Sequence, residues 1–369
     1  MTMPSQKPVR VLHVVRPATG GIRQHLRSLL NGLDPAKVVN SVAAPRKLLA
    51  AVSDCSNLVA SVRVNISARL SPSDLQVAQV LASVQPQFSD IVHAHGVRAA
   101  WVAALASRRH SFPLIFTAHN QIERGLLARL AVSWISRRCT QILAVSEAVA
   151  GSLAACGAPR SKIKVVPNGI DAAAFKAADA FAATSARAEA RTAFSLPETA
   201  FVVAAAARFS PEKGLDVLLQ AARQRKAMTF LIAGNGPQFA ALSRNLPPNV
   251  KLLGRVDDVR LLLSAADVFA APSRREGQGI AALEAMAAGV PVVASRVGGL
   301  AEMLSDGETA LLVPPDDPEA LAAALSRLQG AGRLRQNLAE SALALVKECY
   351  SLQAMLDTLT EIYQAAGRS

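Results

Sequence analysis

Short apolar runs alternate along the whole chain with stretches whose apolar residues recur at helical spacing. Val9–Val15 is β-branched and apolar, Gly20 and Gly21 form a turn, and residues 22–33 then carry isoleucine or leucine every three or four positions. The same pattern predicts strands at 90–95, 113–118, 141–145, 164–166, 201–206, 229–233, 250–253, 268–271 and 290–294, and helices at 214–223, 261–265, 279–288 and 351–366. Strands that alternate with helices indicate the α/β class, with parallel sheets covered on both faces.

The length of 369 residues is too great for one ordinary core and predicts two domains. We expect a first Rossmann-like domain at 1–170 and a second at 197–345. Between them, 171–196 is rich in alanine and predicts a hinge segment outside the core, and the C-terminal helix at 346–369 is expected to pack back toward the first domain. Two doubly wound parallel sheets would direct the carboxyl ends of their strands toward a central cleft, where such sheets bind ligands.

The net charge of +13 is distributed unevenly. Residues 1–170 hold 20 Lys and Arg against 6 Asp and Glu, whereas residues 171–369 hold 20 against 21. This asymmetry favours an anionic partner for the first half, such as a membrane surface, a lipid phosphate or a nucleic acid, although a purely solubilising role for the charge remains open.

The cysteines and the apolar runs bear on the compartment. Four cysteines lie far apart without metal-ligand spacing, which favours free thiols in a reducing compartment. The first residues are polar and carry two prolines, and no apolar run is long enough to span a bilayer. These features predict a cytoplasmic protein, with peripheral attachment to the inner face of the cytoplasmic membrane as a further hypothesis.

The segment EGQGIAALE holds the strongest candidate chemistry. Glu276 and Glu284 are eight residues apart, so on one helix both would face a single ligand. Gly277 and Gly279 would let backbone N–H groups approach an anion at the helix N-terminus. A helix dipole could explain Glu276 alone, but a second glutamate within an apolar helix is costly without a partner.

At this point the sequence resembles the retaining glycosyltransferases of the GT-B type, family 4. The resemblance covers nearly the whole chain, through TGGIRQHLRSLL, DIVHAHG, FTAHN, ILAVSEAV, VVPNGID, ARFSPEKG, LIAGNGP, LLGRVDDV, AADVFAAPSRREGQG and LEAMAAGVPVVAS. It implies transfer of a hexosyl group from a nucleotide-diphosphate-sugar, most simply a UDP- or GDP-sugar, with retention of configuration. The nucleotide-sugar would be a co-substrate, so no cofactor is expected.

The resemblance also assigns roles to individual residues. Arg208 and Lys213 would hold the donor diphosphate, Glu276 the sugar hydroxyls and Glu284 the ribose, and His119 would lie at the reaction centre. The implied catalytic residues are His119, Arg208, Lys213 and Glu276, and the implied donor-binding residues are Gly20, Gly21, Arg208, Lys213, Gly234, Gly236, Arg255, Val256, Glu276, Gly277, Gln278, Gly279 and Glu284. His95 and Asn120 would face the acceptor. Surface bases, plain turns and satisfied core histidines are the structural alternatives.

Two residues depart from the family pattern. Ala207 replaces the usual glycine before the arginine, which would crowd the phosphates, and Gln278 replaces the usual aromatic residue, which would change the choice of sugar. There is no Asp-x-Asp motif, so no metal is implied at the donor site.

The acceptor is expected to contact the basic first half. Within 121–139 the apolar residues Ile122, Leu126, Leu127, Leu130, Trp134 and Ile135 alternate with Arg124, Arg129, Arg137 and Arg138. Such a helix suits an anionic membrane interface with tryptophan as the anchor, although a core-facing helix with a solvated basic face fits equally well. We therefore expect a lipid-linked or cell-envelope acceptor, as in lipopolysaccharide or exopolysaccharide biosynthesis.

Other functions fit less well. No strand leads into G-x-G-x-x-G with a downstream acidic residue, no P-loop is present, and no nucleic-acid recognition motif accompanies the basic half. A catalytically silent scaffold and a nucleotide-sugar epimerase remain alternatives on the same fold. An inverting mechanism with a histidine of the first domain as general base is a further alternative.

Overall fold

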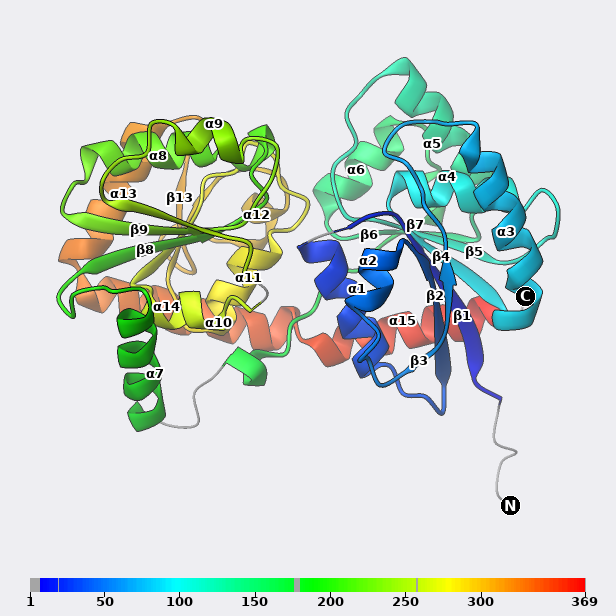
Figure 1. The fold of residues 1–369 in the computed structure, drawn as a ribbon, viewed down its shortest axis with the longest axis horizontal. Helices are drawn as coiled ribbons and strands as arrows, with labels where there is room; N and C mark the ends of the chain where they lie inside the picture. The colour runs from blue at the N-terminus through cyan, green and yellow to red at the C-terminus, as the bar shows by residue number, and fades with distance from the viewer. Residues whose placement is uncertain (1–6, 19, 176–179, 257, 369) are drawn as a thin grey trace. The chain divides into compact units, whose positions relative to one another are not determined.

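The computed structural model describes residues 7–18, 20–175, 180–256 and 258–368, with the side chains of 180–183 excepted. The chain forms two compact units. Unit 1 comprises Met1–Gly169 together with Leu352–Ser369, and unit 2 comprises Ile170–Ser351. Each unit is built around its own sheet (Figure 1).

Unit 1 holds a seven-stranded, fully parallel sheet in the order β3-β2-β1-β4-β5-β6-β7. Its strands are β1 (Val9–Val15), β2 (Val38–Ala44), β3 (Leu58–Arg63), β4 (Ile91–His95), β5 (Leu114–Ala118), β6 (Gln141–Ala144) and β7 (Ile163–Val165). Its helices are α1 (Gly21–Gly32), α2 (Arg46–Ala50), α3 (Ser73–Phe88), α4 (Val97–Ala106), α5 (Leu126–Arg138), α6 (Glu147–Ala155), the 3-10 turn η1 (Arg160–Lys162) and α15 (Leu352–Gly367).

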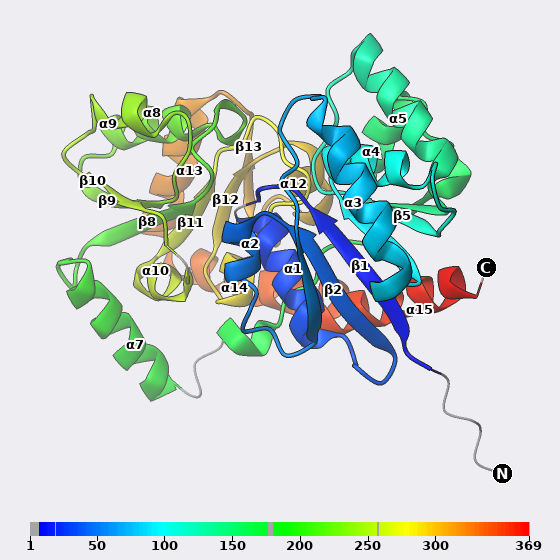
Figure 2. The ribbon, with the colours of Figure 1, turned by 45° about the vertical axis from the view of Figure 1, so that its right-hand side comes forward.

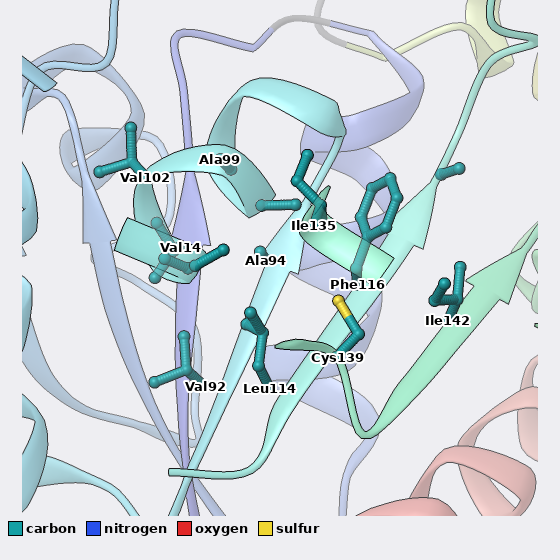
Figure 3. Close-up of a cluster of buried hydrophobic side chains, with 14 of the residues drawn as sticks. Val14, Val92, Ala94, Ala99, Val102, Leu114, Phe116, Ile135, Cys139 and Ile142 are labelled. Atoms are coloured by element: carbon teal, nitrogen blue, oxygen red, sulfur yellow. The ribbon is translucent and has the colours of Figure 1, made fainter. Parts of the chain in front are cut away.

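Both faces of this sheet are covered because alternate strand residues point to opposite sides. Leu12 and Val14 of β1 pack with α3, α4, α5 and α6. Figure 3 shows part of this cluster, with Val14 near Ala99 and Val102 of α4. Val11 packs on the other side, against α1 and α15. Figure 2 shows α15 running along that second face, beside α1 and β1. His13 follows Val11 by two residues and therefore also points to the α1 and α15 side.

Unit 2 holds a six-stranded parallel sheet in the order β10-β9-β8-β11-β12-β13. Its strands are β8 (Phe201–Ala206), β9 (Met228–Ala233), β10 (Val250–Gly254), β11 (Val268–Ala271), β12 (Val292–Ser295) and β13 (Leu311–Val313). Its helices are η2 (Ala172–Phe175), α7 (Ala180–Ala193), η3 (Pro211–Lys213), α8 (Leu215–Gln224), α9 (Phe239–Ser243), α10 (Arg260–Ala265), α11 (Ile280–Ala287), α12 (Gly298–Met303), α13 (Pro318–Gly330) and α14 (Gly332–Cys349).

The same alternation builds two apolar layers in unit 2. Val202 and Ala204 pack with α10, α11 and α14, and Phe201 and Val203 pack with α8 and α13. In each sheet the order of strands reverses beside its first strand, β1 or β8, which is the doubly wound arrangement. The predicted fold class is therefore confirmed for both units.

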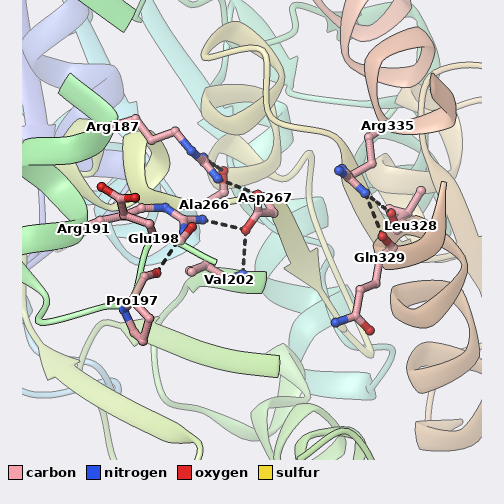
Figure 4. Close-up of polar contacts among 10 residues, drawn as sticks. All are labelled: Arg187, Arg191, Pro197, Glu198, Val202, Ala266, Asp267, Leu328, Gln329 and Arg335. Carbon is pink, nitrogen blue, oxygen red and sulfur yellow. Dashed lines mark hydrogen bonds and ion pairs between the residues drawn. The ribbon is translucent and has the colours of Figure 1, made fainter. Parts of the chain in front are cut away.

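The predicted hinge is in part packed against unit 2. Residues 176–179 lie outside the described residues, but α7 follows them, and its Ala190 is fully buried. Figure 4 shows how the helix is attached: Asp267 accepts hydrogen bonds from Arg187 at 2.6 Å and from Arg191 at 2.9 Å, and also from the backbone N–H of Val202 at 2.7 Å. The expectation that this segment stays out of the core is therefore wrong at Ala190.

Several elements were missed from the sequence. No prediction was made for the strands β2, β3 and β13 or for the helices α2, α3, α4, α9, α12, α13 and α14. The predicted strands agree with observed ones to within one or two residues, and so do the predicted helices apart from the one expected at 121–139. The first missed strand, VVNSVAA, places Asn40 and Ser41 in the interior, where both side chains are buried. Polar residues inside an apolar run hide a buried strand from a pattern search.

Candidate active site

Loops that follow the strands of unit 2 are joined by backbone hydrogen bonds at the carboxyl edge of the sheet. The loop after β8 is linked to that after β9 through Phe209 N–H to Asn235 O at 3.0 Å, and the loop after β9 to that after β10 through Gly234 N–H to Gly254 O at 2.7 Å. The loop after β11 joins them through Arg274 N–H to Glu212 O at 2.8 Å. Most predicted donor-binding residues of this unit therefore lie on loops that meet at one edge, whereas Glu284 lies within α11.

Two glycines are required for these close approaches. A Cβ atom at Gly234, whose φ is 132°, would overlap with the carbonyl oxygen of Ala207. A Cβ atom at Gly299, at the start of α12, would overlap with the carbonyl oxygen of Gly277. Gly234 therefore has a packing reason beyond that of a plain turn, and α12 lies directly against the loop that carries Glu276.

Lys213 and Glu276 form an ion pair at this edge. Lys213 Nζ donates to Glu276 Oε1 at 2.8 Å and to Oε2 at 2.6 Å, and Ser273 Oγ donates to Oε2 at 3.1 Å. The side chains are 24% and 12% exposed. A cation and a carboxylate on two different loops thus meet in a site that is largely shielded from water.

Glu276 and Glu284 do not share a helix. Helix α11 begins at Ile280, with Gly279 in the left-handed conformation as its N-cap, so Glu276 belongs to the preceding loop. The expectation that the two glutamates face one ligand from a single helix is wrong, because the glycines break the backbone between them. Gly277 and Gln278 of the same loop are buried.

Glu284 is partly buried among the apolar residues of α11. Burial, reinforced by the negative charge of Asp258, raises the pKa of its carboxyl to about 7. Near neutral pH the side chain can therefore either donate or accept a hydrogen bond. A group with this property is often found at functional sites.

The second predicted cation, Arg208, is exposed in the loop after β8. The pKa of Glu212, in the same loop, is lowered overall. Burial by itself would raise it, but hydrogen bonds from the backbone and Ser210, together with the charges of Arg208 and Lys213, have the larger effect. The positive charges of Arg208 and Lys213 are therefore both close enough to stabilise the ionised carboxylate of Glu212. Beyond β10, Arg255 is exposed, Val256 packs against the core, and Gly236 lies against Phe209.

Unit 1 carries a chain of imidazoles at the corresponding edge of its own sheet. His13 Nε2 lies 2.9 Å from Asn40 Oδ1, His13 Nδ1 lies 3.1 Å from His95 Nε2, and His95 Nδ1 lies 3.3 Å from His119 Nε2. His95 is buried and His119 is partly buried. The two histidines singled out from the sequence are therefore adjacent members of one hydrogen-bonded chain.

Three further histidine and tyrosine side chains complete this cluster. The ring nitrogens of His93 lie 2.7 Å from Tyr363 Oη of α15 and 2.7 Å from Thr117 Oγ1. The ring of His25, on α1, lies 4.9 Å from that of His119 between centroids. Sequence reasoning missed His13, His25, His93 and Tyr363. The spacing of His93 and His95 by two residues was the available signal, because it places both on one face of a strand.

Burial keeps these imidazoles neutral. It lowers the pKa of His13 to about 4, although the hydrogen bond that His13 donates to Asn40 acts in the opposite direction. It also lowers the pKa of His25 to about 4, an effect that His13 reinforces and Asn168 opposes. Burial and the neighbouring rings bring the pKa of His95 well below the usual value, and burial together with His25 does the same for His119. At neutral pH the chain therefore offers lone pairs and N–H groups without a net charge.

The remaining predicted residues of unit 1 are more exposed. Gly20 precedes α1 with φ of 61°, Gly21 is the first residue of that helix, and Asn120 is exposed just after β5. Whether Gly20 and Gly21 touch a donor stays a prediction. Among the described residues, every helix is too short or too polar to cross a bilayer.

The segment 121–139 forms a shorter helix than expected, α5, with a different exposed face. Leu126, Leu127 and Leu130 are 74%, 79% and 60% exposed. Trp134 instead packs against Trp101 at 4.6 Å between ring centroids, and the guanidinium of Arg138 lies 4.1 Å from the centroid of its ring. The expectation of a tryptophan anchor is therefore wrong, because that ring belongs to the edge of the core.

Family models and curated relatives agree with this geometry. A model described as glycosyltransferase family 4 matches residues 19–174, and one described as glycosyl transferases group 1 matches 200–330. A D-inositol 3-phosphate glycosyltransferase of Saccharomonospora viridis is 32% identical over 79% of this chain and 73% of its own length. One of Salinispora arenicola is 34% identical over 69% of this chain and 64% of its own length.

Solved structures agree on the fold. Anabaena Alr3699/HepE in complex with UDP-glucose has a TM-score of 0.84 at 22% identity, covering 97% of this chain and 100% of its own. Sucrose-phosphate synthase of Thermosynechococcus elongatus has a TM-score of 0.81 at 21% identity, covering 98% and 99%. Two doubly wound parallel sheets with this set of edge loops define the GT-B class of glycosyltransferase.

Within that class, the chain belongs to glycosyltransferase family 4. The protein is accordingly a glycosyltransferase, and the scaffold and epimerase alternatives are no longer favoured.

Proposed function

We propose that this protein transfers a hexosyl group with retention of configuration from a UDP-sugar or a GDP-sugar to a hydroxyl of an anionic acceptor. The observation that carries the proposal is the ion pair of Lys213 and Glu276 at the edge of unit 2, on loops whose close packing requires Gly234 and Gly299. Glu284 lies on α11, the helix that follows the loop of Glu276. The structure of Anabaena Alr3699/HepE, which has a similar fold, is a complex with UDP-glucose. This favours a UDP-sugar as the first donor to test.

In this proposal the charged groups of unit 2 divide the donor between them. Lys213 exchanges its bond to Glu276 for one to the diphosphate, and Arg208, which is exposed, closes on the same phosphates. Glu276 is then free to accept hydrogen bonds from sugar hydroxyls, and Glu284 from the ribose. Two cations without a metal are sufficient to stabilise the departing diphosphate.

Retention is proposed to follow from attack on the same face as departure. The acceptor hydroxyl adds to the anomeric carbon as the bond to the diphosphate breaks, and a phosphate oxygen takes the hydroxyl proton. The ring of His119 is neutral and partly buried, which suits a hydrogen bond to the sugar. Catalysis would then rest on positioning and charge stabilisation.

The acceptor is proposed to be anionic because residues 1–170 carry 20 basic against 6 acidic residues. Two candidates share that chemistry. One is a lipid-linked or cell-envelope glycan, and the other is an inositol phosphate, as the names of the relatives suggest. A soluble inositol phosphate and a lipid-linked phosphate can be offered to the same enzyme and compared by product formation.

Contact with an anionic membrane is a second proposal, carried by α5. Leu126, Leu127 and Leu130 of α5 are exposed, and so are Arg129 and Arg137 of the same helix and Arg124 just before it. Leucine side chains enter the interface while arginine binds anionic headgroups. Sedimentation with phosphatidylcholine vesicles, with and without phosphatidylglycerol, tests this.

Replacing Leu126, Leu127 and Leu130 by serine should abolish sedimentation with the anionic vesicles. The control replaces Leu70 and Leu75, each 63% exposed elsewhere in unit 1, and should change nothing. Equal recovery of the wild type with both vesicle types would rule out the membrane proposal.

The donor is tested by screening UDP- and GDP-sugars for thermal stabilisation and hydrolysis. A true donor raises Tm by mass action, and Lys213→Ala and Glu276→Ala should lose that shift. Lys226→Ala and Glu308→Ala, at exposed positions of unit 2, serve as matched controls. NMR of the product's anomeric proton then reports the configuration, and an inverted product would refute the retaining mechanism.

A further inference from the structure

Three histidines of unit 1 bring ring nitrogens together at one point. One ring nitrogen from each of His25, His95 and His119 lies within 4.8 Å of the other two. They come from α1, from the end of β4 and from the residue after β5. Three neutral imidazoles from three separate elements are the ligand set of many zinc sites.

The spacing of two of these nitrogens already suits coordination. His95 Nδ1 and His119 Nε2 face one another at 3.3 Å. Zinc–nitrogen bonds of about 2.0–2.1 Å at a tetrahedral angle separate two ligand atoms by about 3.3–3.4 Å. An ion could therefore replace the proton between these nitrogens with little movement of either ring. The His25 ring, 5.5 Å from that of His95 and 4.9 Å from that of His119, completes the triangle.

The hydrogen bonds behind His95 prepare its tautomer. Asn40 Oδ1 can only accept, so His13 donates to it from Nε2 and accepts at Nδ1. His95 must then donate from Nε2 to His13, which leaves the lone pair of His95 on Nδ1, facing His119. Metal-binding histidines usually have their second nitrogen fixed by such a donation.

His25 supplies an independent observation. Its side chain is 6% exposed, and neither ring nitrogen makes a hydrogen bond of normal geometry within the described part of the chain. A buried polar group without a partner costs about 1–3 kcal/mol, so a buried imidazole of this kind calls for a ligand. A second group, His13, His93 and His95, fits less well because both nitrogens of His93 are bonded to Tyr363 and Thr117.

We propose that His25, His95 and His119 form a zinc-binding site in unit 1. Three neutral ligands leave the ion with its double positive charge and one open position. That position would take a water molecule or an oxygen of an anionic ligand. The site holds none of the donor-binding residues of unit 2, but it shares His119 with the proposed reaction. Nε2 of His119 faces His95 and would bind the ion, which leaves Nδ1 for the sugar. Metal binding is measured without donor or acceptor, so failure of the zinc site and failure of the proposed reaction can be told apart.

Titration of the untagged, full-length protein with Co²⁺ and Zn²⁺ tests the site. A Cys349→Ser background removes the exposed thiol as a competing ligand. Binding of Co²⁺ should produce the strong visible absorption of a four-coordinate ion, and one equivalent of Zn²⁺ should displace it. Zinc should also raise Tm in proportion to the logarithm of its concentration.

His25→Gln is the informative variant, because it removes a ligand whose ring nitrogens make no hydrogen bond of normal geometry within the described residues. It should weaken zinc binding by roughly 100-fold, whereas His110→Gln, at an exposed histidine outside the cluster, should leave it unchanged. Circular dichroism in EDTA shows whether each variant is folded. Equal zinc affinity of the two variants, or no saturable binding by the wild type, would overturn the proposal.

Nitrogen-15 NMR of the wild-type imidazoles provides a readout that needs no variant. On addition of Zn²⁺ the resonances of three rings should shift to the values of metal-bound nitrogen, and that of His110 should not. Shifts confined to His110, or spread evenly over all six histidines, would contradict the site.

Discussion

The ion pair between Lys213 and Glu276 should stabilise unit 2, and a double-mutant cycle measures by how much. Exposed ion pairs contribute about 0.2–1 kcal/mol, and removing one partner of a buried pair costs about 3–5 kcal/mol. With side chains that are 24% and 12% exposed, this pair lies between the two limits. We therefore expect Lys213→Met or Glu276→Gln alone to cost about 1–3 kcal/mol.

The double variant should cost little more than either single one, because each single change leaves a partly buried charge or dipole without its partner. The coupling free energy is expected at about 1–2 kcal/mol. Unit 2 spans Ile170–Ser351, so each kcal/mol should lower its Tm by about 2–4 °C. The exposed pair of Arg296 and Asp306, 55% and 45% exposed at 2.9 Å, is the control and should show almost no coupling.

Urea unfolding followed by circular dichroism gives the four free energies of the cycle. Tryptophan fluorescence runs in parallel as an internal reference, because Trp101 and Trp134 both belong to unit 1. A coupling below about 0.3 kcal/mol, or the same coupling in the control pair, would refute the reasoning that shielding from water strengthens this pair. A saturating donor nucleotide should reduce the coupling, since the proposed function has Lys213 leave Glu276 for phosphate.

Three further predictions concern single positions. The pKa of Glu284 is about 7 in the folded protein and about 4.5 when unfolded, so between these pH values the folded state holds a proton that the unfolded state has lost. The free energy of unfolding should therefore fall by up to about 3 kcal/mol as the pH rises from 5 to 8. Urea titrations of Glu284→Gln should no longer show this dependence on pH. Gly299→Ala should cost about 1–3 kcal/mol through its clash with Gly277 and lower donor affinity in calorimetry, whereas Gly330→Ala, with open space around it, should do neither. Tyr363→Phe should cost about 1–3 kcal/mol by leaving a nitrogen of His93 unbonded, seen as an earlier fluorescence transition, and an equal effect of Tyr350→Phe would contradict this.

Local patterns were sufficient for most of the sheet and for the donor-side candidates. Phe201–Ala206 and Val268–Ala271 are uninterrupted apolar runs, and both were predicted with their observed bounds. Glu276 and Glu284 were found because charged residues stand beside or within an apolar helical run, and Lys213 was assigned by the resemblance to the family. Short-range periodicity carries this information because a buried parallel strand is apolar on both faces.

The histidine cluster could not be found in this way. His13 and His93 sit inside strands, His25 within a helix and Tyr363 near the C-terminal end of the described chain, 270 residues from the histidine that it contacts. Only the order of strands in the sheet, with β1 beside β4 and β4 beside β5, brings them together. Similarly, the spacing of Glu276 and Glu284 suggested one helix, and the left-handed Gly279 placed the first of them in a loop.

The position of α15 affects how the chain can fold during synthesis. Met355, Leu356, Leu359 and Tyr363 fill one apolar cluster of unit 1, yet they are translated after every residue of unit 2. Domains usually fold in the order of their synthesis. Here the second unit can complete its core on the ribosome first, while one face of the earlier sheet stays uncovered until the last helix emerges. We would therefore expect chaperones to bind nascent chains that end before residue 352 chiefly through the exposed surface of β1 and α1.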